Sequence, residues 1–195
     1  MRDLAILIFV TLDGVMQGPS SPEEDPSGGF TQGGWAAPYW NEVMQQVEAE
    51  AMSVPYDLLL GRTTYDLFAS SFENADESNL AAHRLNRAHK FVATSSATRP
   101  LEWRSATRVT GDVATEVAGL KARDGLLLQV HGSWQLIQTL LEHDLVDELR
   151  LWTFPVVLGG GKRLFAQGST PADFKLLRTG CTPNGVTMGI YRRAP

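Results

Sequence analysis

Residues 126–133 read Leu-Leu-Leu-Gln-Val-His-Gly-Ser, and the segment after them carries Leu136, Ile137, Leu140 and Leu141 on one helical face. A short apolar run that ends at a glycine is typical of a buried strand, and the helical spacing that follows predicts an amphipathic helix. A strand that leads through a tight turn into a helix is the repeating unit of α/β proteins. This stretch therefore predicts an α/β fold.

The same unit recurs toward the N-terminus. Residues 4–10 are continuously apolar, as expected for a strand of a parallel sheet that is covered on both faces. Further strands are predicted at residues 57–60, at residues 90–93 and around Val109, and further helices begin near Pro38, Thr64 and Asp112. Strands that alternate with helices predict a mostly parallel central sheet with helices on both faces.

The last third of the chain has a different pattern. Residues 149–153 alternate between apolar and polar side chains, which indicates a strand. Asn184-Gly185 separates the extended segments 174–179 and 186–191, and this dipeptide is a strong hairpin signal. We therefore expect a C-terminal antiparallel hairpin at one edge of the sheet.

Length, composition and charge limit the function classes. The chain has 195 residues, of which 43% are hydrophobic and 20% charged, and this suits a single globular domain over residues 1–195. The net charge of −5 argues against a nucleic acid or an anionic membrane as partner, since both need a surplus of Lys and Arg. The apolar run 4–10 is too short to span a bilayer. Cys181 is the only cysteine, which excludes an intramolecular disulfide and fits a cytoplasmic protein.

Three strand ends carry residues that could hold phosphate groups. They are residues 61–64 (Gly-Arg-Thr-Thr), 94–96 (Thr-Ser-Ser) and 132–134 (Gly-Ser-Trp). In open α/β sheets, ligands bind beyond the carboxyl ends of the strands, and the first and third segments also begin helices whose N-termini favour anions. The alternative is that Thr63 and Ser133 are ordinary helix N-caps.

Arg62 adds a more specific expectation. A guanidinium directly after such a strand could bind a ribose 2′-phosphate with two parallel hydrogen bonds, and this would select NADPH over NADH. The predicted cofactor-binding residues are Gly61, Arg62, Thr63, Thr64, Ser95, Ser96, Gly132, Ser133 and Trp134.

Other chemical motifs do not match. Residues 159–163 read Gly-Gly-Gly-Lys-Arg, but a P-loop needs an earlier glycine and a serine or threonine after its lysine. Ser133 lacks the flanking glycines of a hydrolase nucleophile, because His131 and Gln135 stand in their places. The four histidines lack the spacing of metal ligands, so we expect no metal.

Four segments, in order along the chain, carry a family resemblance. They are Thr11-Leu12-Asp13-Gly14, Leu60-Gly61-Arg62-Thr63-Thr64-Tyr65, Val130-His131-Gly132-Ser133, and the block from Leu145 through Pro155 to Gly161. Together they resemble the reductase domain of the bifunctional riboflavin deaminase-reductase, in a standalone form. The zinc-binding deaminase half is missing, since it would need a P-C-x-x-C pattern. The resemblance implies the three-layer dihydrofolate-reductase-like fold and NADPH as cofactor.

The resemblance also implies roles for individual residues. Asp13 would orient or protonate the substrate, although Asp13-Gly14 could equally form an ordinary turn. The residues expected to bind substrate are Trp35, Pro155 and Gly159. Trp40, Met44 and Val47 occupy the helix face toward the pocket, where dihydrofolate reductase uses an acidic residue, and this argues against folate reduction.

Two functions from different classes remain open. The first is an NADPH-dependent reductase that acts on a pterin-, flavin- or pyrimidine-like heterocycle. The second is a non-catalytic nucleotide- or flavin-binding module on the same fold, since no convincing proton donor stands out. An acyl hydrolase built on Ser133 is a weaker third reading. The family resemblance also implies a homodimer, and an exposed Trp152 on the alternating strand would be compatible with one.

Overall fold

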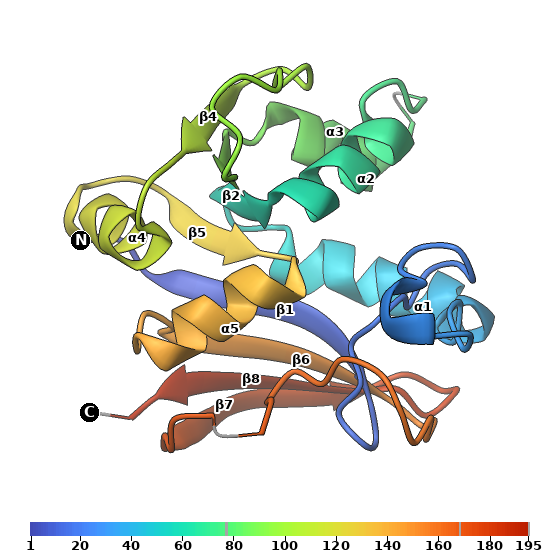
Figure 1. Cartoon of the computed structure of the whole chain (residues 1–195). Helices are drawn as coiled ribbons and strands as arrows, with labels where there is room; N and C mark the ends of the chain where they lie inside the picture. Colours follow the sequence, from blue (N-terminus) through green and yellow to red (C-terminus); the bar gives the residue numbers. More distant parts are fainter. Residues whose placement is uncertain (77, 168, 195) are drawn as a thin grey trace.

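A single eight-stranded sheet forms the centre of the computed structural model, which describes residues 1–76, 78–167 and 169–194 (Figure 1). The strand order is β4-β3-β2-β5-β1-β6-β8-β7. All neighbours from β4 to β6 pair in parallel, whereas β8 pairs antiparallel with both β6 and β7. The strands are β1 (Leu4–Thr11), β2 (Tyr56–Gly61), β3 (Lys90–Ala93), β4 (Ala106–Val109), β5 (Leu127–Val130), β6 (Glu148–Phe154), β7 (Phe174–Cys181) and β8 (Thr187–Arg193).

Helices cover both faces of the sheet (Figure 1). They are α1 (Trp40–Gln46), continued by a π-helical turn (Val47–Ala51), α2 (Arg62–Phe72), α3 (Leu80–Arg87), α4 (Val113–Ala122) and α5 (Trp134–Glu142). Successive residues of a strand point to opposite faces, so that Leu58 and Leu60 pack with α1, α2 and α3, whereas Leu59 packs with α4 and α5. The three-layer α/β sandwich predicted from the sequence is confirmed.

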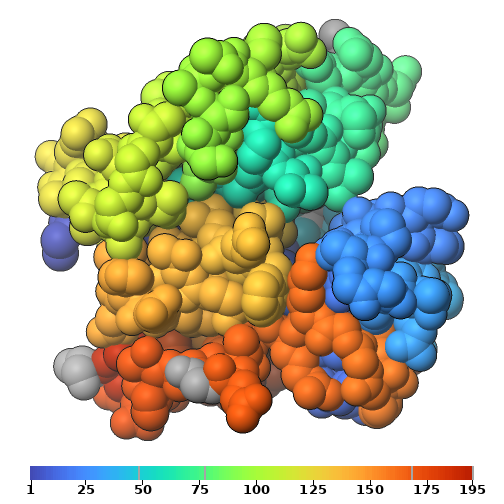
Figure 2. Space-filling view, in the orientation of Figure 1, coloured from blue at the N-terminus to red at the C-terminus, as the bar shows by residue number. Residues whose placement is uncertain are grey.

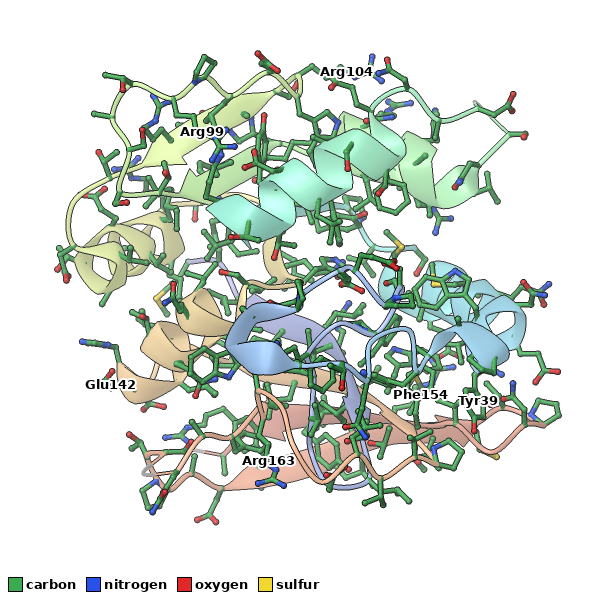
Figure 3. All side chains as sticks on the ribbon, turned by 45° about the vertical axis from the view of Figure 1, so that its right-hand side comes forward. Tyr39, Arg99, Arg104, Glu142, Phe154 and Arg163 are labelled. Atoms are coloured by element: carbon green, nitrogen blue, oxygen red, sulfur yellow. The ribbon has the colours of Figure 1, made fainter. Side chains whose placement is uncertain are left out.

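An aromatic cluster fills the core beneath α1. Phe154 is wholly buried, and its ring meets those of Trp35 and Tyr39 edge-on at centroid distances of 5.2 and 5.6 Å. Figure 3 shows Tyr39 beside Phe154. Trp152 belongs to the same cluster with no exposed surface, so the expectation of an exposed Trp152 is wrong. The reason is that β6 lies inside the sheet, between β1 and β8.

The C-terminal hairpin forms as predicted, with Asn184 and Gly185 in its turn. Gly185 has a φ of +89°, a left-handed conformation that glycine adopts without strain. The hairpin places β7 at the edge of the sheet, where Leu176 and Leu177 are more than half exposed. This edge strand therefore exposes two leucines next to the charged side chains of Lys175 and Arg178.

Both chain ends lie at the same side of the sheet, on the left in Figure 1. Arg192 near the end of β8 donates to Asp3 at the start of β1, with 2.6 Å between Nη1 and Oδ2. This side holds the amino ends of the parallel strands, so their carboxyl ends lie opposite. Among the described residues, no helix has the length and apolarity needed to cross a membrane.

Candidate functional site

The carboxyl ends of β2, β3 and β5 meet at one edge of the sheet. Gly61 at the end of β2 pairs with Ala93 at the end of β3, and the Gly61 N–H donates to the carbonyl oxygen of Gly132 at 3.2 Å. A side chain at Gly61 would begin 2.0 Å from the Ser133 hydroxyl oxygen. The structure thus brings together the strand ends that carry the predicted cofactor-binding residues.

Two helices begin at this edge, and neither has a side-chain cap. The N-cap residues of α2 and α5 are Gly61 and Ser133, and neither makes a side-chain cap hydrogen bond. In contrast, Asn79 caps α3 and Asp112 caps α4 through their side-chain oxygens. The first N–H groups of a helix have no partner within it, and together with the helix dipole they attract anions. The helices at the site therefore keep these donors available.

This arrangement departs from the alternative that Thr63 and Ser133 are ordinary N-caps. Thr63 lies inside the first turn of α2, and Ser133 stands at the N-cap position without making a cap hydrogen bond.

A polar cavity of about 500 Å³ lies over the two helix ends. Thr63, Thr64, Gly132, Ser133 and Trp134 line it, together with Gln17, Asp25 and Lys162 from loops. A Cβ on Gly132 would lie 2.7 Å from the Thr64 hydroxyl oxygen, and its φ of +140° is unfavourable for any other residue. Packing against Thr64 and the backbone conformation thus both require glycine at position 132.

The long loop at residues 17–34 forms one wall of this cavity. Lys162 joins it through its ammonium group, at 2.7 Å from both an Asp25 carboxylate oxygen and the Ser27 hydroxyl. Gln17 donates to two carbonyl oxygens within the loop. In Figure 2 the blue loop lies beside the orange segment that contains Lys162. These hydrogen bonds therefore attach the loop to the segment that contains Lys162.

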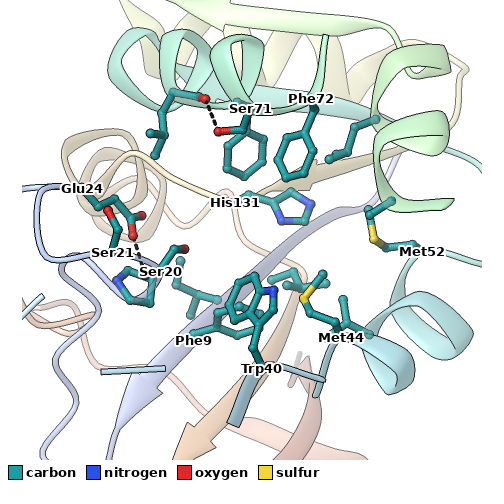
Figure 4. Close-up of a pocket in the computed structure, with 18 residues that line it drawn as sticks. Phe9, Ser20, Ser21, Glu24, Trp40, Met44, Met52, Ser71, Phe72 and His131 are labelled. Carbon is teal, nitrogen blue, oxygen red and sulfur yellow. Dashed lines mark hydrogen bonds between the residues drawn. The ribbon is translucent and has the colours of Figure 1, made fainter. Parts of the chain in front are cut away.

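A second, apolar cavity of about 310 Å³ adjoins the polar one (Figure 4). Trp40, Met44 and Val47 line it, as expected from the helical pattern. Its other large apolar side chains include Phe9, Met52, Phe68 and Phe72. The two cavities share six lining residues, namely Ile8, Pro19, Glu24, Leu67, Phe68 and His131. The two cavities are therefore neighbours that share one wall.

His131 lies at the junction of the two cavities and belongs to a buried polar network. Its Nε2 is 2.9 Å from the side-chain nitrogen of Gln129, and the Gln129 oxygen accepts from Arg150 at 3.2 Å. Arg150 in turn donates to Glu148 at 2.6 Å. Burial, with a smaller contribution from the positive charge of Arg150, lowers the pKa of His131 to about 4. The ring is therefore uncharged at neutral pH.

Arg62 lies on the outer side of α2, away from the polar cavity. Its Nε donates to the Asp66 carboxylate at 2.9 Å, and its Nη1 donates to the carbonyl oxygen of Arg99 at 3.3 Å. Arg99 also pairs with Asp66 at 3.0 Å, and Arg108 donates to the same Arg99 carbonyl. The Ser96 hydroxyl accepts from the Arg99 N–H at 3.1 Å. Three guanidinium groups and one carboxylate thus gather next to the end of β3.

Asp13 does not line either cavity. Its carboxylate accepts from the Thr11 hydroxyl at 2.6 Å and from the N–H groups of Leu158 and Gly159 at 3.2 and 2.8 Å. These hydrogen bonds, led by that of Thr11, lower the pKa of Asp13 to about 2. The Asp13 carboxylate is therefore ionised at neutral pH and hydrogen-bonded to the loop that contains Leu158 and Gly159, and its expected role in orienting or protonating the substrate stays a prediction.

The structure also places the expected substrate-binding residues outside both cavities. Trp35 is a core residue whose indole N–H donates to the carbonyl oxygen of Gln17 at 2.8 Å. Pro155 and Gly159 are exposed in the loop that Asp13 holds. The sequence reasoning instead missed Phe68 and Phe72, whose four-residue spacing on α2 was visible but also fits ordinary core packing.

The chain is similar to several known proteins. The profile of the RibD C-terminal domain family matches residues 2–188. YyaP of Bacillus subtilis (strain 168), described as uncharacterized, is 27% identical over 195 residues, which are 97% of this chain and 94% of YyaP.

Solved structures share the fold at lower identity. A Shewanella sp. PV-4 protein named for riboflavin biosynthesis matches with a TM-score of 0.67 at 22% identity over 100% of both chains. Dihydrofolate reductase from Enterococcus faecalis, complexed with NADP(H) and RAB-propyl, matches with a TM-score of 0.64 at 13% identity over 99% of this chain and 97% of its own. A pyrimidine reductase-like protein from Corynebacterium diphtheriae matches with a TM-score of 0.59 at 10% identity, over 100% and 92%. These likenesses show the dihydrofolate-reductase-like fold.

Proposed function

Because the chain belongs to the RibD C-terminal domain family, we propose that it is an NADPH-dependent reductase that transfers hydride to a small heterocyclic substrate. The observation that carries this proposal is the pair of helices that begin without side-chain caps over one polar cavity. A dinucleotide with a pyrophosphate suits such a site, because its anionic oxygens would accept from the free N–H groups. We further propose that the protein acts in the cytoplasm as a homodimer.

The lining residues fit this cofactor. The first turns of α2 and α5, with Thr63, Thr64 and Ser133, would hold the pyrophosphate, and Gly132 leaves room for it at the backbone. Arg62, Ser95 and Ser96 would hold the adenosine end with its 2′-phosphate. NADPH supplies the hydride when it is bound. The chain supplies orientation and a cavity with apolar walls that excludes water from the substrate.

A glycine pair tests the proposed cofactor site. Gly132→Ala places a methyl group 2.7 Å from the Thr64 hydroxyl in an unfavourable conformation, whereas Gly119→Ala in α4 meets nothing within 4 Å. We expect Gly132→Ala to weaken NADPH binding by about tenfold or more, and Gly119→Ala to leave it unchanged. Quenching of tryptophan fluorescence by NADPH measures both affinities, since Trp134 lines the cavity. Circular dichroism checks that each variant is folded.

Assays of the wild-type protein distinguish the reductase from the non-catalytic binding module. NADPH oxidation in the presence of pterins, flavins and pyrimidines would support the reductase. NADPH binding without turnover of any of them would support the non-catalytic module. An absence of any fluorescence change or thermal stabilisation by NADPH would contradict the proposal.

A further inference from the structure

Some of the polar groups around the apolar cavity are already hydrogen-bonded to other protein atoms. The Ser71 hydroxyl donates to the carbonyl oxygen of Leu67 at 3.0 Å. Glu24, on the loop side of Figure 4, accepts from the Ser20 N–H at 2.6 Å. His131 projects between the aromatic side chains, with its ring centre 5.9 Å from that of Phe68. Its ring nitrogens therefore decide what the inner part of this cavity recognises.

The buried network fixes which ring nitrogen carries the proton. Arg150 can only donate, so the side-chain oxygen of Gln129 must face it. The Gln129 amide nitrogen then faces His131 and donates to Nε2 at 2.9 Å. Since the ring is uncharged and Nε2 accepts, the proton lies on Nδ1. Gln129 is wholly buried, and Arg150 is held by Glu148, so neither amide nor ring can easily turn over.

The Nδ1–H group of His131 is available to donate a hydrogen bond to a ligand. Across the residues described here, no protein atom accepts a hydrogen bond from it, and His131 lines both cavities. His131 is only partly buried, so water can satisfy this donor in the absence of a ligand, and a ligand that displaces the water must accept the hydrogen bond in its place. A ligand atom that accepts a hydrogen bond would satisfy this group.

We propose that the apolar cavity binds a flat, uncharged ring that carries a carbonyl oxygen, and that the His131 Nδ1–H donates to this oxygen. Phe9, Trp40, Phe68 and Phe72 would contact the ring faces and edges, and the two methionines, Met44 and Met52, would fill the remaining width. The position of His131 at the junction places the carbonyl group beside the polar cavity. This step rests on the proposed function only for the reaction, because the binding itself needs no cofactor.

The charges that face His131 disfavour a cationic ligand in the inner cavity. Arg150 lies behind Gln129 and is the positive group that acts on the ring. Glu148 is bound to Arg150 and to Arg192, at 2.6 and 3.3 Å, so its charge is already balanced. Among the described residues that line this cavity, Glu24 carries the only carboxylate, and it already accepts from the Ser20 N–H. A protonated 2,4-diaminopyrimidine ring would therefore have a carboxylate partner only on the loop side of the cavity.

Three bicyclic probes of nearly equal size test the proposal in the absence of NADPH. They are quinazolin-4-one, which carries the carbonyl group, naphthalene, which has none, and 2,4-diaminoquinazoline, which is cationic at neutral pH. Ligand-observed NMR titration gives their dissociation constants. We expect the wild-type protein to bind quinazolin-4-one about three- to tenfold more tightly than naphthalene, the range of one neutral hydrogen bond, and 2,4-diaminoquinazoline more weakly than both.

Three variants assign this preference to one side chain. In His131→Phe the ratio of the quinazolin-4-one and naphthalene affinities should fall to about one, while the naphthalene affinity stays near its wild-type value. His131→Asn, which keeps an N–H donor, should retain part of the preference. His143→Phe, at an exposed histidine after α5, should behave as the wild type.

The outcomes separate this inference from the proposed function. An unchanged ratio in a folded His131→Phe variant, or tightest binding of 2,4-diaminoquinazoline, would overturn the assignment to His131. The proposed function is tested separately by the NADPH titration of the wild-type protein, so neither result decides it. Conversely, a protein that fails to bind NADPH but shows the carbonyl preference would support the inference and contradict the reductase.

Discussion

The guanidinium of Arg62 lies between the Asp66 carboxylate and the carbonyl oxygen of Arg99, on the outer side of α2. Arg62, Arg99 and Arg108 bring three positive charges to this rim, and Asp66 balances one of them. Glu73 and Glu102 line the same pocket as Arg62 and Arg99 and add negative charge beside them. The side chain that is proposed to bind the 2′-phosphate thus also fastens the start of α2.

Arg62→Ala should weaken NADPH binding by at least tenfold and NADH binding by less than twofold, because the two cofactors differ only in the 2′-phosphate. Fluorescence titrations with both cofactors measure the two effects. Arg123→Ala, at an exposed position after α4, is the matched control. Equal losses for NADPH and NADH would place the 2′-phosphate elsewhere.

Residue types were easier to predict than the directions of side chains. Arg62 and Gly132 stand out in the sequence because they follow strands, and this local context was enough to select them. Trp35 and Asp13 also stand out, but both make their contacts with segments far away along the chain. No local pattern specifies that Asp13 bonds to Gly159, since 146 residues separate them.

At the scale of elements, α3 and α4 begin with side-chain caps, whereas α1, α2 and α5 do not, and the first turns of α2 and α5 line the proposed cofactor cavity. Asp112 accepts from the Thr115 N–H at 2.8 Å at the start of α4, whereas Ser133 makes no such bond at the start of α5. A capping side chain stabilises a helix by about 1 kcal/mol. An uncapped terminus gives up this stabilisation and keeps its N–H groups for a ligand.

Asp112→Ala should therefore lower the free energy of unfolding by about 1 kcal/mol without changing NADPH affinity. Ser133→Ala should cost less stability, because it removes no cap bond, and it should weaken NADPH binding. Urea denaturation gives the free energy of unfolding of each variant, and titration gives its NADPH affinity. If Ser133→Ala destabilised the protein as much as Asp112→Ala, its hydroxyl would have to be a structural cap.

Strands were predicted within two residues where apolar runs are continuous, as for β1, β3 and the start of β7. Helix α3 was missed, because its sequence carries two arginines and a histidine and only a short apolar stripe. Asn79 was the available signal, since asparagine favours the N-cap position. The change from α-helix to π-helix after Gln46 has no signal in the spacing of apolar residues.

For the whole molecule, the order of the strands could not be read from local patterns. The site depends on β2 lying between β3 and β5, although β5 follows β3 by more than 30 residues. No strand order was predicted from the sequence. The alternation of strands and helices predicted only that carboxyl ends would share one edge.

The exposed edge strand β7 bears on the proposed homodimer. Its burial pattern is almost entirely exposed, and Leu176 and Leu177 are 54% and 57% exposed. An unpaired strand with apolar side chains is a favourable surface for association with a second copy. We expect the wild-type protein to elute at twice the 21.4 kDa mass of the chain in size-exclusion chromatography with light scattering.

Leu176→Lys should shift this mass to that of the monomer, because a charge would then be buried in the interface. Leu80→Lys, at an exposed leucine that begins α3, should remain dimeric. A monomeric wild-type protein, or a dimer that both substitutions leave intact, would contradict an interface at β7.

The position of the two chain ends has a practical consequence. Asp3 and Arg192 bond to each other at the side of the sheet where the parallel strands start, and both cavities open where those strands finish. An affinity tag, a surface tether or a fused enzyme attached at either terminus would therefore stand clear of the cavity entrances. The same geometry would let this fold work as a free-standing chain or as one module of a longer polypeptide without redesign of its ligand pocket.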